Sequence, residues 1–310
     1  MSLVTCLLAS TLIASGSDGG TDDGVPLHFN WPIGLTAQVD ESYKPFRTSK
    51  EWLPVMRYQA DVVDGGGGLR KWVPSQREDP GGLPKSVMTV VFDGEGRFRG
   101  YEVPEDDPRR KFVAGLLSFV GGKQEQALAE IRPSEERDAR ALWDKIVTPW
   151  AGRTLVPGTP VTRKTRLRVG PILGYKDMDS TSVLSIETGV PCEPKAKSPK
   201  CVRLTSVTKP DEVYVLPDPP MVERRWVTET CELTADPDTL IPYSMVLQVT
   251  EKAVTGQADG GTERTREPYD GLDRNLIVFT YPDPAKKKAK GDVRTPTPRE
   301  PAHGIFHLPP

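Results

Sequence analysis

Histidine is scarce in this chain, and its placement limits the chemistry that the interior can perform. Three histidines occur among 310 residues, and they are His28, His303 and His307, all close to the chain ends. Ser-His-Asp and Cys-His sites need an imidazole beside the nucleophile as a general base. A core without histidine cannot supply one, so we predict no catalytic residues and favour a non-catalytic role.

Cysteine is also sparse, and its spacing does not suit a metal. The four cysteines are Cys6, Cys192, Cys201 and Cys231, and they lack the close pairs typical of zinc sites. Cys192 and Cys201 flank a Pro- and Lys-rich loop between two expected strands. We therefore predict a disulfide between them, no metal, and a buried Cys231, which is the alternative partner for either of the other two.

Several binding motifs are missing as well. The glycines around Gly94 and Gly96 lack the spacing and the strand-to-helix context of a dinucleotide site, and no phosphate-cradling loop is present. We therefore expect no cofactor. The net charge of −2 provides no general attraction to nucleic acid, so we expect no nucleic-acid partner.

Long apolar runs are absent. Residues 3–14 are apolar apart from Ser10 and Thr11, which is shorter than the roughly 20 residues that a transmembrane helix needs. This run matches the hydrophobic part of a secretory signal, with small residues at Ala14 and Gly16 for cleavage, although no Lys or Arg precedes it. We predict a signal peptide over residues 1–16 and a secreted, periplasmic or cell-envelope location. The alternative is a buried N-terminal strand or helix.

Strand patterns and turn residues dominate the rest. The 31 prolines and 28 glycines favour many turns. Apolar and polar residues alternate over residues 35–40 and 56–62, which is typical of strands with one buried face. We predict a flexible linker over residues 17–28, a single β-rich domain over residues 29–281, and a disordered Pro/Lys-rich tail over residues 282–310. Further strands are expected at residues 87–92, 97–103, 161–169, 182–188, 202–208, 222–233, 241–252 and 275–281.

A helical segment interrupts the strands at about residues 109–148. The acidic residues 105–107 precede a first helix over residues 109–120. Ser134 has the hydroxyl expected of an N-cap, and Ala139, Leu142, Trp143, Ile146 and Val147 then share one helical face. We predict a mainly β, α+β fold: a curved antiparallel sheet or open half-barrel with two short helices packed on its concave face.

This order of strands, helices and strands behind a signal resembles that of the half-barrel carriers of lipids and lipoproteins in bacterial envelopes. The resemblance lies in the order of elements and not in a sequence motif. It implies a cavity between helices and sheet that binds a lipid or another apolar ligand. The residues expected to line this cavity are Phe112, Leu116, Leu142, Trp143 and Ile146. The alternative interpretation is that they form a filled core.

Two other functions remain open. An exported hydrolase acting on a glycan would need two carboxylates beside a sugar cleft, and the six tryptophans could line one. However, residues 105–107 fit a helix start and Asp236 and Asp238 fit a turn. The second of these functions is that of a surface interaction module. Its basic tail residues 286–290 would make a weak contact with an anionic surface.

Overall fold

The structure is a computed structural model in which placement is defined for most of the chain between residues 24 and 282. The described residues are 24–44, 51–78, 88–104, 107, 110–111, 115, 124–169, 176–193, 200–218, 221–257 and 271–282. The predicted signal peptide and nearly all of the predicted tail lie outside these residues.

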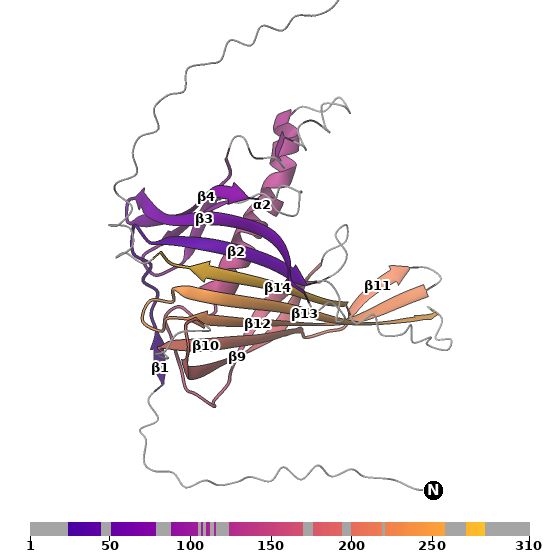
Figure 1. Cartoon of the computed structure of the whole chain (residues 1–310). Helices are drawn as coiled ribbons and strands as arrows, with labels where there is room; N and C mark the ends of the chain where they lie inside the picture. Colours follow the sequence, from indigo (N-terminus) through magenta and orange to yellow (C-terminus); the bar gives the residue numbers. More distant parts are fainter. Residues whose placement is uncertain are drawn as a thin grey trace, which may run out of the picture.

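The fold is mainly β, as predicted, and it is built around one open antiparallel sheet of twelve strands (Figure 1). The strand order is β6-β5-β4-β3-β2-β14-β13-β12-β10-β9-β8, and β11 pairs with β12 beyond the end of β10. The path does not return to its start, so the sheet is not a closed barrel. The strands before the helix are β2 (Thr36–Lys44), β3 (Leu53–Gly66), β4 (Leu69–Glu78), β5 (Thr89–Asp93) and β6 (Phe98–Glu102). Those after it are β8 (Val161–Val169), β9 (Lys176–Val190), β10 (Cys201–Pro210), β11 (Tyr214–Asp218), β12 (Met221–Ala235), β13 (Pro242–Gln257) and β14 (Gly271–Thr280).

Strands from the two ends of the chain meet in the middle of the sheet. β2 pairs with β14 in antiparallel register, from Lys44 opposite Arg274 to Gln38 opposite Thr280. The strands before the helix form one half of the sheet, and those after it form the other half. The β2–β14 pairing is therefore the seam that joins them.

The helix α2 (Gln124–Ile146) packs across one face of this sheet, here called the helix face. It follows β6, the last strand at one edge, and precedes β8, the last strand at the other edge. The chain must therefore cross the sheet, whose ten inter-strand spacings span roughly 50 Å. A helix of 23 residues covers roughly 35 Å of that path. Figure 1 shows α2 passing behind the central strands.

The predicted start of this helix was wrong. Ser134 is not an N-cap, because α2 begins at Gln124 and continues through Pro133 and Ser134. A proline inside a helix removes one hydrogen bond and costs about 3 kcal/mol, and here the docked C-terminal half of α2 offsets that cost. The C-terminal end is near the predicted place, since α2 ends at Ile146 and turns follow to Gly152. Most of the predicted first helix lies outside the described residues, although Arg110, Lys111 and Gly115 are helical.

An aromatic cluster fixes α2 to the sheet. The ring of Trp143 stacks on Phe92 at 4.7 Å between centroids and meets Trp31 edge-on at 5.3 Å. Trp31 also contacts Trp72 at 5.2 Å. The buried indole N–H groups are satisfied, because Trp31 donates to the carbonyl of Leu240 and Trp143 donates to a backbone carbonyl of the β5–β6 turn. These tryptophans are therefore core residues and do not line a sugar cleft.

A small second sheet begins earlier than the predicted domain. β1 (Val25–Leu27) pairs with β7 (Arg153–Leu155), and Leu27 and Leu155 are both buried. The predicted linker over residues 17–28 is thus corrected at residues 25–27, which form a strand. The signal there was weak, because a three-residue strand shows no alternation that sequence analysis can detect.

The predicted disulfide is present. Cys192 and Cys201 are bonded, with their Cα atoms 5.1 Å apart. The bond closes the connection between β9 and β10, where Cys201 lies opposite Val190. Cys231 is buried on β12, as predicted, and it is free, so it does not compete with Cys192 or Cys201.

Candidate functional site

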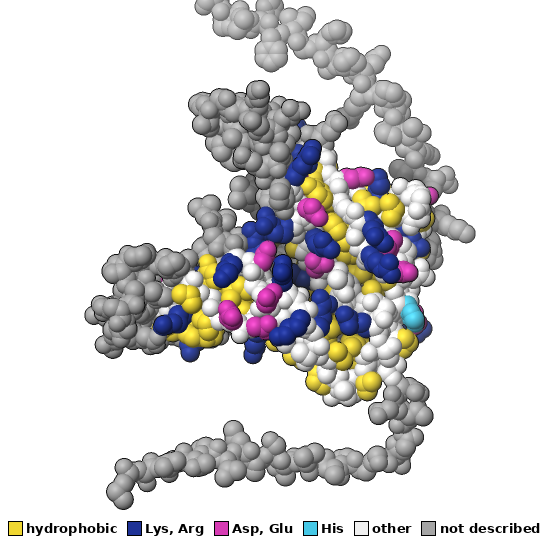
Figure 2. All heavy atoms as spheres, turned by 180° about the vertical axis from the view of Figure 1, so that it is seen from behind, with side chains coloured by type: hydrophobic (Ala, Val, Ile, Leu, Met, Phe, Trp, Pro, Cys, Tyr) yellow, Lys and Arg dark blue, Asp and Glu magenta, His cyan; other side chains and the backbone are white. Residues whose placement is uncertain are grey.

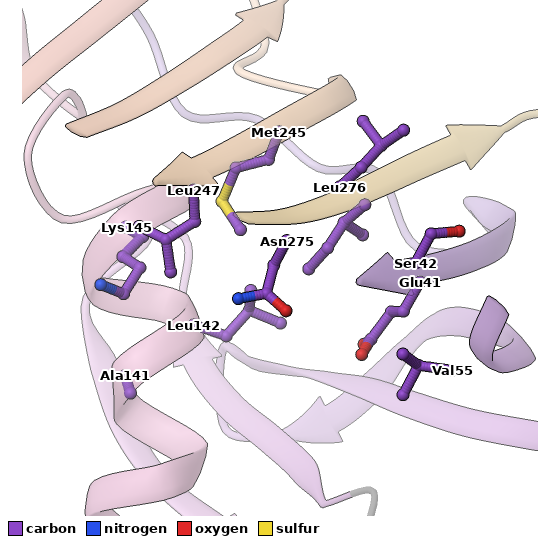
Figure 3. A pocket seen from close by; sticks show the side chains of 11 residues that line it. Glu41, Ser42, Val55, Ala141, Leu142, Lys145, Met245, Leu247, Asn275 and Leu276 are labelled. Carbon is purple, nitrogen blue, oxygen red and sulfur yellow. The ribbon is translucent and has the colours of Figure 1, made fainter. Parts of the chain in front are cut away.

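A groove lies between α2 and the seam of the sheet (Figure 3). Its volume is about 180 Å³. This is larger than the roughly 150 Å³ apolar cavity that holds a benzene molecule in an engineered protein. The side chains and backbone around it come from α2 and from four strands, two on each side of the seam. The lining residues are Glu41, Ser42, Val55, Ala141, Leu142, Lys145, Met245, Leu247, Asn275, Leu276 and Ile277.

The periodicities of helix and strand place these side chains together. Ala141 and Lys145 are four residues apart on α2, so they lie one turn apart on one side of it. Met245 and Leu247 on β13 are two residues apart, so both point to the helix face. Asn275 and Ile277 on β14 lie directly opposite Leu247 and Met245 in the register. The groove is therefore a consequence of strand register beneath one helix turn.

The groove wall is mainly apolar, and its charged groups are already engaged. Lys145 forms an ion pair of 2.6 Å with Glu229 on β12. Glu41 interacts with the hydroxyl of Tyr58, whose pKa is raised by burial first and then by the negative charge of Glu41. These groups therefore border the groove without offering a free charge to a ligand.

The groove also holds one amide side chain, that of Asn275. The side-chain amide of Asn275 makes no hydrogen bond to any residue that the structure describes. In Figure 3 it points into the groove between Leu142 and the strands. An amide can both donate and accept hydrogen bonds. The site thus combines mainly apolar walls with a few polar groups, among them the Asn275 amide and the Ser42 hydroxyl, which is the usual composition of a small-molecule pocket.

The predicted cavity residues divide into three groups. Leu142 lines the groove. Trp143 and Ile146 instead point into the core, because they lie on the part of α2 that faces the aromatic cluster. Phe112 and Leu116 lie outside the described residues. Sequence analysis missed Asn275, Met245 and Leu247, although Met245 and Leu247 belong to an alternation along residues 241–252 that indicates a shared face.

A second hollow is wider and more polar. It has a volume of about 570 Å³ and lies by the β5–β6 turn and the C-terminal end of α2. The charged groups around it are occupied, since Arg97 pairs with Glu95 and Arg140 lies over the ring of Phe98 at 5.2 Å. His28 also lines it. The described residues that line this hollow do not bring two acids together.

Carboxylates elsewhere have structural partners. Glu135 is buried and forms two hydrogen bonds, of 2.8 and 2.7 Å, with the guanidinium of Arg110. Asp107 accepts a hydrogen bond from the backbone N–H of Arg110, as the predicted helix start requires. Asp236 accepts from two backbone N–H groups in its turn, which confirms the turn interpretation.

The carboxyls with shifted pKa do not suit a general acid. Burial acts to raise the pKa of Asp93, but hydrogen bonds from the backbone of Arg97 and the side chain of Arg99 bring it below its usual value. The pKa of the surface carboxyl Asp211 is lowered by hydrogen bonds from Thr181 and Lys164. A general acid needs the opposite shift. The described residues therefore do not provide the pair of carboxyl groups that the hydrolase alternative needs.

No protein-family model matches the chain, and no curated protein matches it significantly. Within the described ranges, no group of three or more His, Cys, Asp or Glu residues is arranged to hold a metal ion. In the part of the chain that the structure describes, no helix is both long and apolar enough to cross a membrane.

Proposed function

We propose that this protein is an exported, non-catalytic binding protein that holds the apolar chain of a lipid-like molecule in the groove between α2 and the sheet seam. The observation that carries the proposal is the groove itself, with Leu142, Val55 and Leu247 as apolar walls and Asn275 as a free amide inside. A hydrocarbon chain in these walls gains about 0.8 kcal/mol for each buried methylene. The amide can bond a carbonyl or hydroxyl group of the same ligand.

Export is the second part of the proposal. It is supported by the apolar run at residues 3–14 and by the disulfide, because disulfides persist mainly in oxidising compartments. Intact mass and N-terminal sequencing of the protein from its native cells test this part. We expect a mature chain that begins at Ser17, and a chain retaining residues 1–16 contradicts export.

The binding test fills the groove from its rim. Ala141 lines the groove and its side chain is exposed, so Ala141→Phe adds a ring to the groove without opening the core. Glu136→Phe is the matched control, because Glu136 is exposed on the same helix and does not line the groove. If the added ring displaces two methylenes of the ligand from the groove, binding weakens by about tenfold or more.

The probe is cis-parinaric acid, a fatty acid that fluoresces when its chain enters an apolar site. We expect saturable fluorescence enhancement with the native protein and with Glu136→Phe, and a dissociation constant about tenfold higher for Ala141→Phe. Native mass spectrometry after gentle extraction shows whether a lipid also co-purifies. Equal affinity in all three proteins would remove the groove as the binding site.

A further inference from the structure

A row of polar side chains crosses the helix face beside the groove. Strand register places Arg163 on β8 opposite Ser182 on β9, Ser182 opposite Thr208 on β10, and Thr208 opposite Glu229 on β12. Residues directly opposite each other in a sheet point to the same face. Glu229 is the partner of Lys145, which lines the groove. The row therefore runs from the groove to the β8 edge of the sheet.

The hydroxyls in this row are buried and close together. Ser182 and Thr208 are 4% and 6% exposed, and their oxygens are 2.6 Å apart. When one hydroxyl donates to the other, the second keeps its own proton to donate elsewhere. A further hydroxyl, that of Ser206, lies 3.5 Å from that of Thr208, which is the outer limit for a hydrogen bond. The pair thus has a donor to offer.

Arg163 ends this row, and Arg153 on β7 acts on it electrostatically. Neither Arg163 nor Arg153 forms an ion pair or side-chain hydrogen bond within the described part of the chain. Burial lowers the pKa of Arg163, and the positive charge of Arg153 lowers it further, so Arg153 lies within electrostatic range of Arg163. The negative charge of Asp144 raises the pKa of Arg163. The Asp144 carboxylate, however, also accepts a hydrogen bond of 2.9 Å from the hydroxyl of Thr148.

This arrangement is unfavourable for the folded protein alone. Two half-buried cations repel each other and lose hydration, and neither is compensated by a direct ion pair. The basic residues of β8 that face outward have acidic neighbours, since Lys164 pairs with Asp211 and Arg166 lies near Asp179. On β8, acidic residues thus accompany the outward-facing Lys164 and Arg166. Arg163 and Arg153 have no direct ion pair among the described residues, so they are available to bind an anion.

We propose that Arg153, Arg163, Ser182 and Thr208 form a binding site for an oxyanion, such as a phosphate or carboxylate group. Guanidinium groups bind such groups through two parallel hydrogen bonds, and a hydroxyl at the floor adds a third donor. The oxyanion neutralises the repulsion between the arginines. Figure 2, the view opposite to that of Figure 1, shows charged side chains of both signs interspersed across the middle of the molecule.

The geometry also suggests where the oxyanion comes from. Three inter-strand spacings separate β12 from β8, which is roughly 14 Å. An amphiphile whose chain occupies the groove can reach that far with its headgroup. This identification of the oxyanion as a headgroup rests on the proposed function, whereas the oxyanion site itself does not.

The test compares two substitutions on opposite faces of β8. Arg163→Gln removes the inward guanidinium, and Arg166→Gln removes an outward one with the same loss of charge. Arg163→Gln is expected to fold and to unfold at an equal or higher temperature without ligand, because it removes the repulsion. The probes are inorganic phosphate and dihexanoyl phosphatidic acid, each titrated calorimetrically at constant ionic strength.

We expect at least one probe to bind the native protein, and Arg163→Gln to weaken that binding by about tenfold or more, as loss of a charged hydrogen bond implies. Arg166→Gln should bind as the native protein does. Binding of neither probe, equal binding by Arg163→Gln, or equal loss in both variants overturns the site.

The groove variant then separates the two sources of the oxyanion. If Ala141→Phe also weakens phosphatidic acid binding, the oxyanion is the headgroup of the groove ligand. If Ala141→Phe has no effect while Arg163→Gln weakens binding, the oxyanion site stands, and the oxyanion is not the headgroup of the groove ligand; the groove itself is then judged by the fatty-acid titration. The two proposals can therefore fail independently.

Discussion

Replacing Gly96 by alanine should destabilise the protein, because this glycine lies where the β5–β6 turn meets the end of α2. Its φ is +78°, which an L side chain rarely adopts. Its carbonyl accepts the indole N–H of Trp143 at 2.7 Å. A Cβ added at Gly96 would lie 2.6 Å from Cγ of Phe29 and 2.8 Å from Cγ1 of Val147. The added methyl group therefore meets two packed core side chains.

The magnitude follows from two separate costs. A non-glycine residue in the left-handed region costs about 1–2 kcal/mol, and inserting a carbon into a packed core costs about 1–3 kcal/mol. Together they predict a loss of roughly 2–5 kcal/mol in the free energy of unfolding. For a domain of this size the midpoint temperature should fall by about 4–20 °C.

The matched control lies in the same turn. A Cβ added at Gly94 would have no atom within 4 Å, and Gly94 does not have a positive φ. Gly94→Ala should therefore change the free energy of unfolding by less than about 0.5 kcal/mol. Urea unfolding followed by tryptophan fluorescence measures both variants, since Trp143 and Trp31 lie beside the turn. Free energies of unfolding within about 0.5 kcal/mol of each other for the two variants would refute the reasoning.

Three further changes test other parts of the structure. Replacing Cys192 and Cys201 together by serine should lower the free energy of unfolding by roughly 2–3 kcal/mol in urea titrations, because a loop of about ten residues is no longer closed. Cys231, whose pKa burial raises to about 12, should react with iodoacetamide at pH 8 only after unfolding, as measured by mass. Glu135→Gln should cost about 2–3 kcal/mol, less than for a fully buried pair because Arg110 is 26% exposed. Equal urea midpoints for Glu135→Gln and the native protein would show that this ion pair contributes nothing.

Local patterns predicted most of the sheet, since each strand carries its own signal. The alternation at residues 56–62 lies within β3, and the continuous apolar run at residues 87–92 matches β5, whose residues Thr89 to Phe92 are all buried. The partners expected for residues 182–188 and 202–208 are paired, with Ser182 opposite Thr208. Such signals depend on neighbours in the chain, which a sequence displays directly.

The candidate site was harder to predict because it depends on pairings between distant residues. Asn275 and Leu142 are brought together only by the crossing of α2 over the seam, which no local pattern encodes. The start of α2 was missed for a related reason. Pro133 and Ser134 resemble a helix start, yet the packing of the Trp143 face gives enough free energy for the helix to continue through them.

The location of the groove follows from the topology of the chain. α2 connects the two opposite edges of the sheet, so its path crosses the place where β2 pairs with β14. Val55 lies on the side of the seam formed before the helix, and Leu247 on the side formed after it. The groove therefore exists only when both halves of the sheet and the helix are assembled. A ligand that binds there contacts all three, so it should stabilise the whole fold in proportion to its affinity and concentration.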